Sequence, residues 1–186
     1  AWIEDGWFNT GDIGYMDAAG FLYLSGRAKD LIIRSGHNID PELIEEPLNA
    51  HAEVVISIAI GLPDPYAGEL PMAYVVKVAD SDVTELELID HCASTISERA
   101  AIPKRIAFID TMPLTAVGKI FRPTLRQKIS EQVIRELLAK ESIDAAITSE
   151  IEKKRGLVLS IDVADKVKID EVKKLVEGYI FTSEVN

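Results

Sequence analysis

The sequence has little cysteine, no excess of basic residues and no long apolar run. Cys92 is the single cysteine of 186 residues, so no internal disulfide can form and a reducing compartment is expected. Asp and Glu total 31 against 20 Lys and Arg, which argues against a broad nucleic-acid surface because phosphate binding needs clustered cations. The longest apolar stretch, residues 54–62, is far shorter than the ~20 residues that cross a bilayer, and no signal peptide is visible. We therefore expect a cytoplasmic protein without a transmembrane segment or a nucleic-acid partner.

Enough apolar material is present for a folded core. Hydrophobic residues make up 47% of the chain and charged residues 27%, as in ordinary globular proteins. Both tryptophans, Trp2 and Trp7, lie in the first eight residues, and no Met stands at the start. Two large aromatic side chains at a free terminus need a surface to pack on. We therefore expect the sequence to be a piece of a longer chain.

Hydrophobic periodicity predicts an α+β fold, with a small three-stranded sheet, flanking helices and N-terminal β-hairpins. Turn residues around short apolar runs indicate paired strands in residues 7–25. The remaining predicted elements, in chain order, are a hairpin at 31–39, a helix at 41–50, strands at 54–60 and 72–78, a helix at 84–99, a strand at 106–109, and a loop at 111–119 that leads into a long amphipathic helix.

Residues 141–186 are expected to form a C-terminal extension with a strand-helix-strand pattern. Ile143, Ile147 and Ile151 continue a helical stripe, and Gly156 stands where a C-cap glycine belongs. Alternating residues then predict a strand at 157–163, followed by a helix at 170–178 and a strand at 179–181. Spare strand edges in this extension favour pairing with a partner or with a second copy of the chain.

Three polar residues in turns could carry chemistry, and each has a plainer interpretation. Lys119 follows Gly118 in a loop that can deliver an ammonium into a cleft, but it could equally be a solvated lysine beside a turn. Arg27 could hydrogen-bond a ribose or a phosphate, or pair with Asp30 on the surface. Asp12 could accept both hydroxyls of a ribose, or bond only to its own backbone. The Gly-Lys pair is no Walker A loop, because the required upstream glycine and downstream hydroxyl residue are absent.

Four blocks in order carry a family resemblance: TGD at 10–12, GRAKD at 26–30 with a glycine at 36, PELIE at 41–45, and GKIFR at 118–122. Together they closely resemble the C-terminal portion of the adenylate-forming superfamily, which includes acyl-CoA synthetases, peptide-synthetase adenylation domains and firefly luciferase. The resemblance covers roughly residues 5–135. The sequences at 35–41 and 63–71 look most like those of fatty-acyl-CoA synthetases.

The resemblance implies an AMP-forming acid-thiol ligase. ATP, with Mg²⁺, and a carboxylate such as a fatty acid would give an acyl-adenylate, and coenzyme A would then displace AMP. Residues 1–27 would be the end of a large adenylation domain, residues 28–140 the mobile C-terminal domain, and residues 141–186 the extension. The missing N-terminal large domain would be the chief partner, so the piece alone is expected to be inactive.

The resemblance also implies roles for individual residues. Lys119 would be the catalytic residue, contacting the carboxylate and the α-phosphate during adenylation only. Asp12 and Arg27 would hold the ATP ribose, and Lys29 would be the hinge about which the domain swivels. The pantetheine arm of coenzyme A would pass along Ser35, Gly36 and His37.

Some positions depart from the pattern, and other functions stay open. Asn38 replaces the Arg of the acetyl-CoA branch, and Ile33 replaces the Lys found in luciferase, which argues against oxidative chemistry. No metal ligands are assigned. The alternatives are an adenylation domain that loads a carrier protein and a non-catalytic module that binds a nucleotide or docks a partner.

Overall fold

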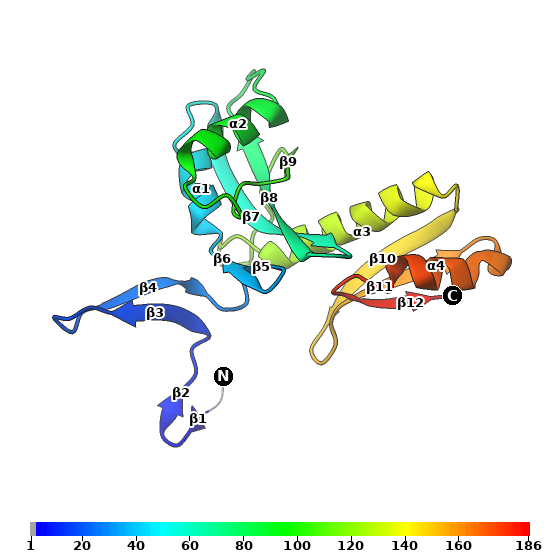
Figure 1. The fold of residues 1–186 in the computed structure, drawn as a ribbon, viewed down its shortest axis with the longest axis horizontal. Coiled ribbons are helices and arrows are strands. Elements are labelled where there is room, and N and C mark those ends of the chain that lie inside the picture. The colour runs from blue at the N-terminus through cyan, green and yellow to red at the C-terminus, as the bar shows by residue number, and fades with distance from the viewer. Residues whose placement is uncertain (1–2) are drawn as a thin grey trace.

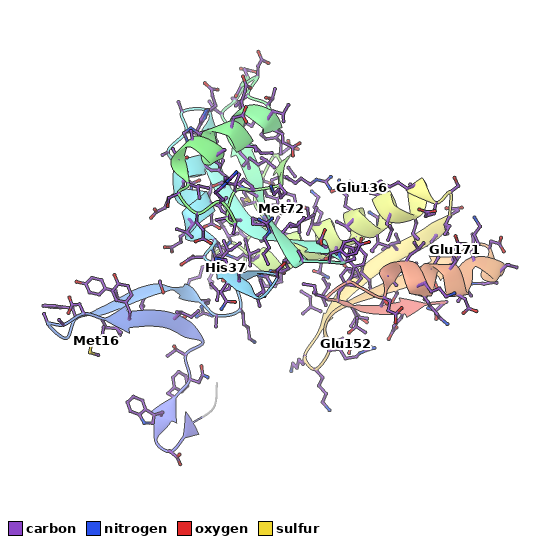
Figure 2. All side chains as sticks on the ribbon, viewed as in Figure 1. Met16, His37, Met72, Glu136, Glu152 and Glu171 are labelled. Atoms are coloured by element: carbon purple, nitrogen blue, oxygen red, sulfur yellow. The ribbon has the colours of Figure 1, made fainter. Side chains whose placement is uncertain are left out.

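The computed structural model describes residues 3–186, so Ala1 and Trp2 lie outside the described residues. The chain begins with two β-hairpins that project away from the rest of the molecule (Figure 1). Their strands are β1 (Ile3–Glu4), β2 (Trp7–Phe8), β3 (Asp12–Met16) and β4 (Leu22–Arg27). Met16 lies on the projecting hairpin, whereas Met72 lies within the central sheet (Figure 2). The Trp7 side chain is 81% exposed, so it has no packing surface among the described residues.

A five-stranded sheet forms the centre of the molecule. It consists of β5 (Ile32–Arg34), β6 (His37–Ile39), β7 (Val54–Asp64), β8 (Gly68–Lys77) and β9 (Arg105–Phe108). β7 pairs antiparallel along one edge of β8, while β5 and β9 share its other edge, β5 beside Gly68 and β9 beside residues 72–75. The predicted α+β class is confirmed. The sheet has two strands more than predicted because the β5–β6 hairpin joins it.

Helices cover both faces of this sheet. α1 (Glu42–Asn49) and α2 (Glu85–Thr95) pack on one face, and the first half of α3 (Arg122–Lys140) packs on the other. Successive strand residues point to opposite faces, so Ala59, Ala73 and Val75 bury against α1 and α2 while Ile58, Ile60, Met72 and Tyr74 bury against α3. A capping box holds the start of α2: Thr84 and Glu87 exchange hydrogen bonds of 2.8 and 3.3 Å.

The second half of α3 supports the C-terminal unit. This unit contains β10 (Ala145–Glu152), β11 (Gly156–Val163), a 3₁₀ turn (Lys166–Lys168), α4 (Ile169–Val176) and β12 (Thr182–Val185). β11 lies between antiparallel β10 and parallel β12. Ile134 and Leu138 of α3 bury in the core of this unit. Val133 packs against both this core and the core under the sheet, so α3 joins the two.

Three expectations for the C-terminal unit are wrong. Residues 143–151 form mostly strand rather than a helical stripe, and Gly156 lies in the β10–β11 hairpin at φ +72° instead of ending a helix. Isoleucines four residues apart fit an even strand period as well as a helical turn, so periodicity alone could not decide. The last strand begins at Thr182, after the predicted residues 179–181.

Tyr74 has a buried hydroxyl without a hydrogen-bond partner among the described residues. Its side chain is 1% exposed, and burial raises the pKa of the phenol to about 12. Replacing Tyr74 by Phe removes an unsatisfied polar atom, so we expect the free energy of unfolding at pH 7 to rise by about 1 kcal/mol in urea titrations.

The same substitution changes the response to alkaline pH. The unfolded phenol ionises near pH 10 but the folded one near 12, so the unfolded state loses its proton first. The contribution of the phenol to the free energy of unfolding is therefore fully present below pH 10 and is lost between pH 10 and 12. Tyr74→Phe should remove this pH dependence. Tyr66→Phe, at a side chain 96% exposed, is the matched control and should change neither quantity. A loss of stability in Tyr74→Phe would contradict the unsatisfied hydroxyl.

Candidate functional site

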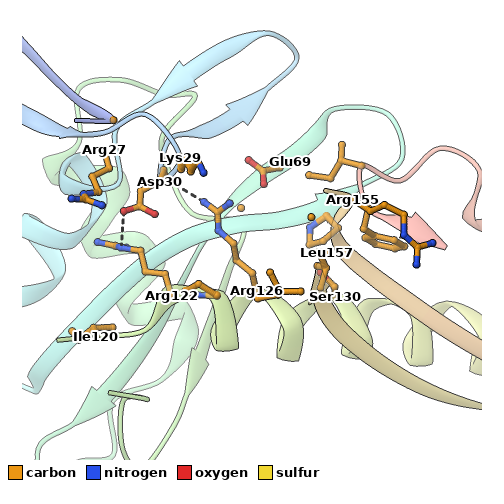
Figure 3. Close-up of a pocket in the computed structure, with 18 of the residues that line it drawn as sticks. Arg27, Lys29, Asp30, Glu69, Ile120, Arg122, Arg126, Ser130, Arg155 and Leu157 are labelled. Atoms are coloured by element: carbon orange, nitrogen blue, oxygen red, sulfur yellow. Dashed lines mark hydrogen bonds and ion pairs between the residues drawn. The ribbon is translucent and has the colours of Figure 1, made fainter. Parts of the chain in front are cut away.

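A wide groove of about 1050 Å³ lies where four parts of the chain meet. These parts are the N-terminal turn with the end of β4, the loop and helix start at 115–130, the C-terminal unit, and residues 61–69 of β7 and β8. Figure 3 shows Arg27, Asp30 and Arg122 at one end of the groove and Arg155 and Leu157 at the other. The predicted site residues that line the groove are Arg27, Lys29 and Lys119.

Lys119 lies in a closed turn ahead of α3. Leu114 and Ile120 form a β-bridge, and Lys119 accepts a 2.7 Å hydrogen bond from the Thr115 amide. Gly118 adopts φ +78°, a left-handed conformation that glycine tolerates without strain. The Lys119 side chain is exposed, and no described residue lies within hydrogen-bond or ion-pair distance of its ammonium nitrogen. The backbone of this turn is therefore fixed while the ammonium remains available to a ligand.

Asp12 and Arg27 are paired across the β3–β4 hairpin. They stand opposite each other in the strand register, with 3.1 Å between Arg27 Nε and Asp12 Oδ1. The Thr10 hydroxyl accepts a 3.1 Å bond from the Asp12 amide. The alternative pairing of Arg27 with the Asp30 carboxylate does not occur, because Asp30 instead faces Arg122 at 3.7 Å. Asp12 thus orients a guanidinium whose side chain is 67% exposed.

Ser35, Gly36 and His37 lie outside the groove, at the β5–β6 hairpin. Ser35 and Gly36 have φ of +50° and +80°, the pattern of a type I′ turn. The Ser35 amide donates to Ala67 O at 2.7 Å, and His37 Nε2 lies 2.6 Å from Glu98 Oε1. The molecule therefore offers two separate sets of predicted site residues, one in the groove and one on this turn.

Comparisons with known proteins agree with these features. Residues 43–119 match the AMP-binding enzyme C-terminal domain. This part of the chain is similar to that domain. This confirms the resemblance drawn from the four sequence blocks.

Two curated relatives are named CoA ligases, and a solved structure has a similar fold. Marinolic acid–CoA ligase of Pseudoalteromonas sp. is 45% identical over 88% of this chain and 25% of its own length. A 2-succinylbenzoate–CoA ligase of Bacillus cereus is 42% identical over 69% of this chain and 26% of its own. ATP-bound MatB from Rhodopseudomonas palustris superposes with a TM-score of 0.65 at 31% identity, covering 70% of this chain and 26% of that one. The chain thus spans about a quarter of the length of the relatives it matches.

Arg122, three residues beyond the matched segment, ties the groove to the sheet. Its guanidinium donates to both oxygens of Glu45, at 2.7 and 3.2 Å, and to Ala59 O at 2.9 Å. Glu45 Oε1 also accepts from the Ala59 amide at 2.8 Å. Burial opposes the charge of Arg122, but the hydrogen bonds and charge of Glu45, with the charge of Asp30, outweigh it and raise the pKa of the guanidinium. The Arg122 guanidinium is therefore held in its charged form by Glu45.

Glu45 and Arg126 are site residues that the sequence did not reveal. Arg126 lines the groove and donates to Asp30 O at 3.4 Å. Glu45 offered one usable signal: it lies beside Ile44 on the apolar stripe of α1, and a carboxylate on a buried face needs a cation. Its partner is 77 residues away in the sequence, so no local pattern names it.

Residues 3–186 offer no candidate for a cluster of metal ligands or for a membrane-spanning helix. No group of three or more His, Cys, Asp or Glu side chains in this part of the chain could hold a metal ion. None of the helices in the same part has both the length and the apolar character needed to cross a membrane.

Breaking the Arg122–Glu45 pair should cost more than breaking an exposed pair. Arg122→Met leaves a carboxylate that is 12% exposed without its cation, so we expect the free energy of unfolding to fall by about 2–3 kcal/mol. Arg27→Met is the matched control, since its pair with Asp12 is largely exposed and should cost less than about 1 kcal/mol. Urea unfolding of both variants measures the difference. Equal losses would show that burial does not set the strength of the Arg122 pair.

Proposed function

We propose that this domain belongs to an AMP-forming acyl-CoA synthetase, an acid-thiol ligase. The observation that carries the proposal is Lys119, an exposed cation on a fixed turn of an AMP-binding C-terminal domain, facing the same groove as Arg27. Two further facts support it: the relatives are named CoA ligases, and one matching structure is a fatty acyl CoA synthetase from Mycobacterium tuberculosis, 36% identical with a TM-score of 0.57.

The reaction has two steps. A carboxylate oxygen attacks the α-phosphorus of ATP, supplied with Mg²⁺ as the substrate complex, and the bond to pyrophosphate breaks. The sulfur of coenzyme A then attacks the acyl carbon of the adenylate, its proton is lost, and AMP leaves. The carboxylate is of the fatty-acid class, as the similarity of residues 35–41 and 63–71 to fatty-acyl-CoA synthetases implies.

Lys119 acts in the first step only. The carboxylate and the α-phosphate are both anionic, and a positioned ammonium offsets their repulsion as negative charge builds up in the transition state. Asp12 and Arg27 hold the ribose: the carboxylate accepts its hydroxyls, and the guanidinium is oriented by the 3.1 Å pair. Acylation of Lys119 would remove its charge and stop this step.

The second step uses the other face of the domain. Lys29 is the hinge, and after rotation about it the turn at Ser35, Gly36 and His37 lines the channel for the pantetheine arm. The location of this turn outside the groove supports a rotation, because one fixed orientation would present only one of the two faces to a substrate.

The rest of the active site lies in a large domain, with residues 1–27 at its end and residues 28–140 forming the mobile domain. The projecting β3–β4 hairpin supports this division, since large apolar side chains on such a hairpin mark a surface that packs on another domain. Those more than 40% exposed on it are Tyr15, Met16, Phe21, Leu22, Tyr23 and Leu24. The single cysteine supports a cytoplasmic location.

Residues 141–186 are also the surface that we propose for self-association. β10 and β12 are the edge strands of the C-terminal sheet, and such edges can pair with a second copy. Light scattering of the chain over a concentration series checks this: a dimer supports the proposal, and a monomer at all concentrations contradicts it.

Lys119→Ala separates the two half-reactions in the longer enzyme. We expect the rate of adenylate formation, measured as pyrophosphate release, to fall by about 10²–10³-fold. This is the usual effect of losing one electrostatic stabiliser. Thioester formation from supplied acyl-adenylate should stay near the wild-type rate. Lys140→Ala, an exposed lysine at the end of α3, is the control. Equal loss of both steps in Lys119→Ala would contradict the assigned role.

The present chain by itself should neither form a thioester nor bind ATP at micromolar concentration, because the phosphate-binding loop and acyl pocket belong to the large domain. Calorimetry with ATP tests this, and micromolar binding would favour the non-catalytic nucleotide-binding module. Thiol exchange with the longer enzyme, coenzyme A against carrier protein, separates the ligase from a carrier-loading domain.

A further inference from the structure

The loop between α4 and β12 packs against the turn that joins β7 and β8. Gly178 lies so close to Pro65 that a Cβ on it would be 3.0 Å from both Cβ and the carbonyl oxygen of Pro65. Ile180 Cγ2 lies 3.6 Å from the position that a Cβ on Gly68 would occupy. A side chain at Gly178 would therefore have to push against Pro65, whereas Gly68 and Ile180 are at ordinary contact distance.

This loop is held firmly on the side of the C-terminal unit. Phe181 is buried in the core beneath α4, and its ring stacks on Tyr179 with 5.4 Å between ring centroids. Burial, and then the negative charge of Asp64, raises the pKa of Tyr179, which agrees with its ring lying beside the β7–β8 turn. Packing thus holds residues 179–181 in a defined conformation against the C-terminal unit.

The β7–β8 turn is rigid as well. The Asp64 carboxylate accepts hydrogen bonds from the amides of Tyr66 and Ala67, at 2.9 and 2.7 Å, and Gly68 adopts φ +77°. Such an Asx turn leaves the chain few alternative conformations. A displacement of Pro65 would therefore also displace Ala67 and Gly68.

These last two residues hold the hairpin that carries Ser35 and Gly36. Ala67 O accepts the 2.7 Å hydrogen bond from the Ser35 amide. In the described part of the chain, the single register pair between β5 and β8 is Arg34 with Gly68. The only other hydrogen bond that β8 makes to this hairpin within residues 3–186 is from the Ile33 amide to Glu69 Oε2, at 2.8 Å. The position of the Ser35–Gly36 turn thus depends on the shape of residues 64–68.

We propose that the loop 178–181 is a positioning element for thioester formation: it supports residues 64–68, which fix the Ser35–Gly36 turn against which the pantetheine arm would lie. This rests on the proposed function for its chemistry, but the structural link stands on the contacts alone. Gly178 is the positioning residue: neither it nor Pro65 lines the groove, whereas Ile180 and Phe181 of the same loop do.

Gly178→Val tests the proposal. The glycine has no left-handed φ, so valine perturbs only the contact with Pro65. In the longer enzyme we expect thioester formation from supplied acyl-adenylate to fall by about tenfold, since small misplacements of a substrate-positioning group have effects of this size. Adenylate formation should stay within about twofold of wild type. Glu177→Val, at the adjacent exposed residue, is the matched control and should leave both rates unchanged.

A second readout does not depend on activity. Amide hydrogen exchange of the present chain should show faster exchange at Ser35 in Gly178→Val, with the amides of α2 unchanged. If the valine variant does not fold, Gly178→Ala is measured instead, and we expect a smaller increase in the exchange rate of the Ser35 amide. Unchanged Ser35 exchange, or equal loss of both half-reactions, overturns the positioning role. A wild-type enzyme that forms no acyl-adenylate would overturn the proposed function alone, because the exchange result would still decide the structural link.

Discussion

The ion pair between Arg122 and Glu45 is the contact on which the rest of this arrangement depends. Arg122 is the first residue of α3, and the Lys119 turn immediately precedes it. Glu45 lies on α1, on the opposite face of the sheet, and both residues bond to Ala59 of β7. Since α3 also carries the C-terminal unit, this one pair fixes the Lys119 turn, the sheet and the extension in a common frame.

Charged groups at the edge of a core are costly unless they satisfy each other. Here the guanidinium has Glu45, Ala59 O and Asp30 around it, and Asp30 follows Lys29 directly. The residue next to the proposed hinge is therefore bound to the start of α3. A rotation about Lys29 would move the Lys119 turn and the Ser35–Gly36 turn together as one rigid body. Two reaction steps that use opposite faces of a domain require such a joint movement.

The sequence allowed much of the fold to be predicted and less of the site. The strands predicted at 54–60, 72–78 and 106–109 correspond to β7, β8 and β9, and the helix predicted at 84–99 corresponds to α2. Isoleucines four residues apart gave the wrong period for β10, because four is also a multiple of two. The Gly118–Lys119 pair indicated a turn with an exposed lysine. The Arg122–Glu45 pair joins positions too distant in the sequence for any local pattern to predict. The roles of Asp12, Arg27, Lys29, Lys119 and Ser35–His37 remain predictions.

The two faces of this domain are proposed to act in turn. Hydrogen exchange of the longer enzyme measures this directly, in one complex with ATP and a non-reactive carboxylate analogue and in another with a stable acyl-adenylate analogue and coenzyme A. We expect protection of residues 113–120 in the first complex and of residues 33–38 in the second. Protection of both segments in the same complex would contradict it.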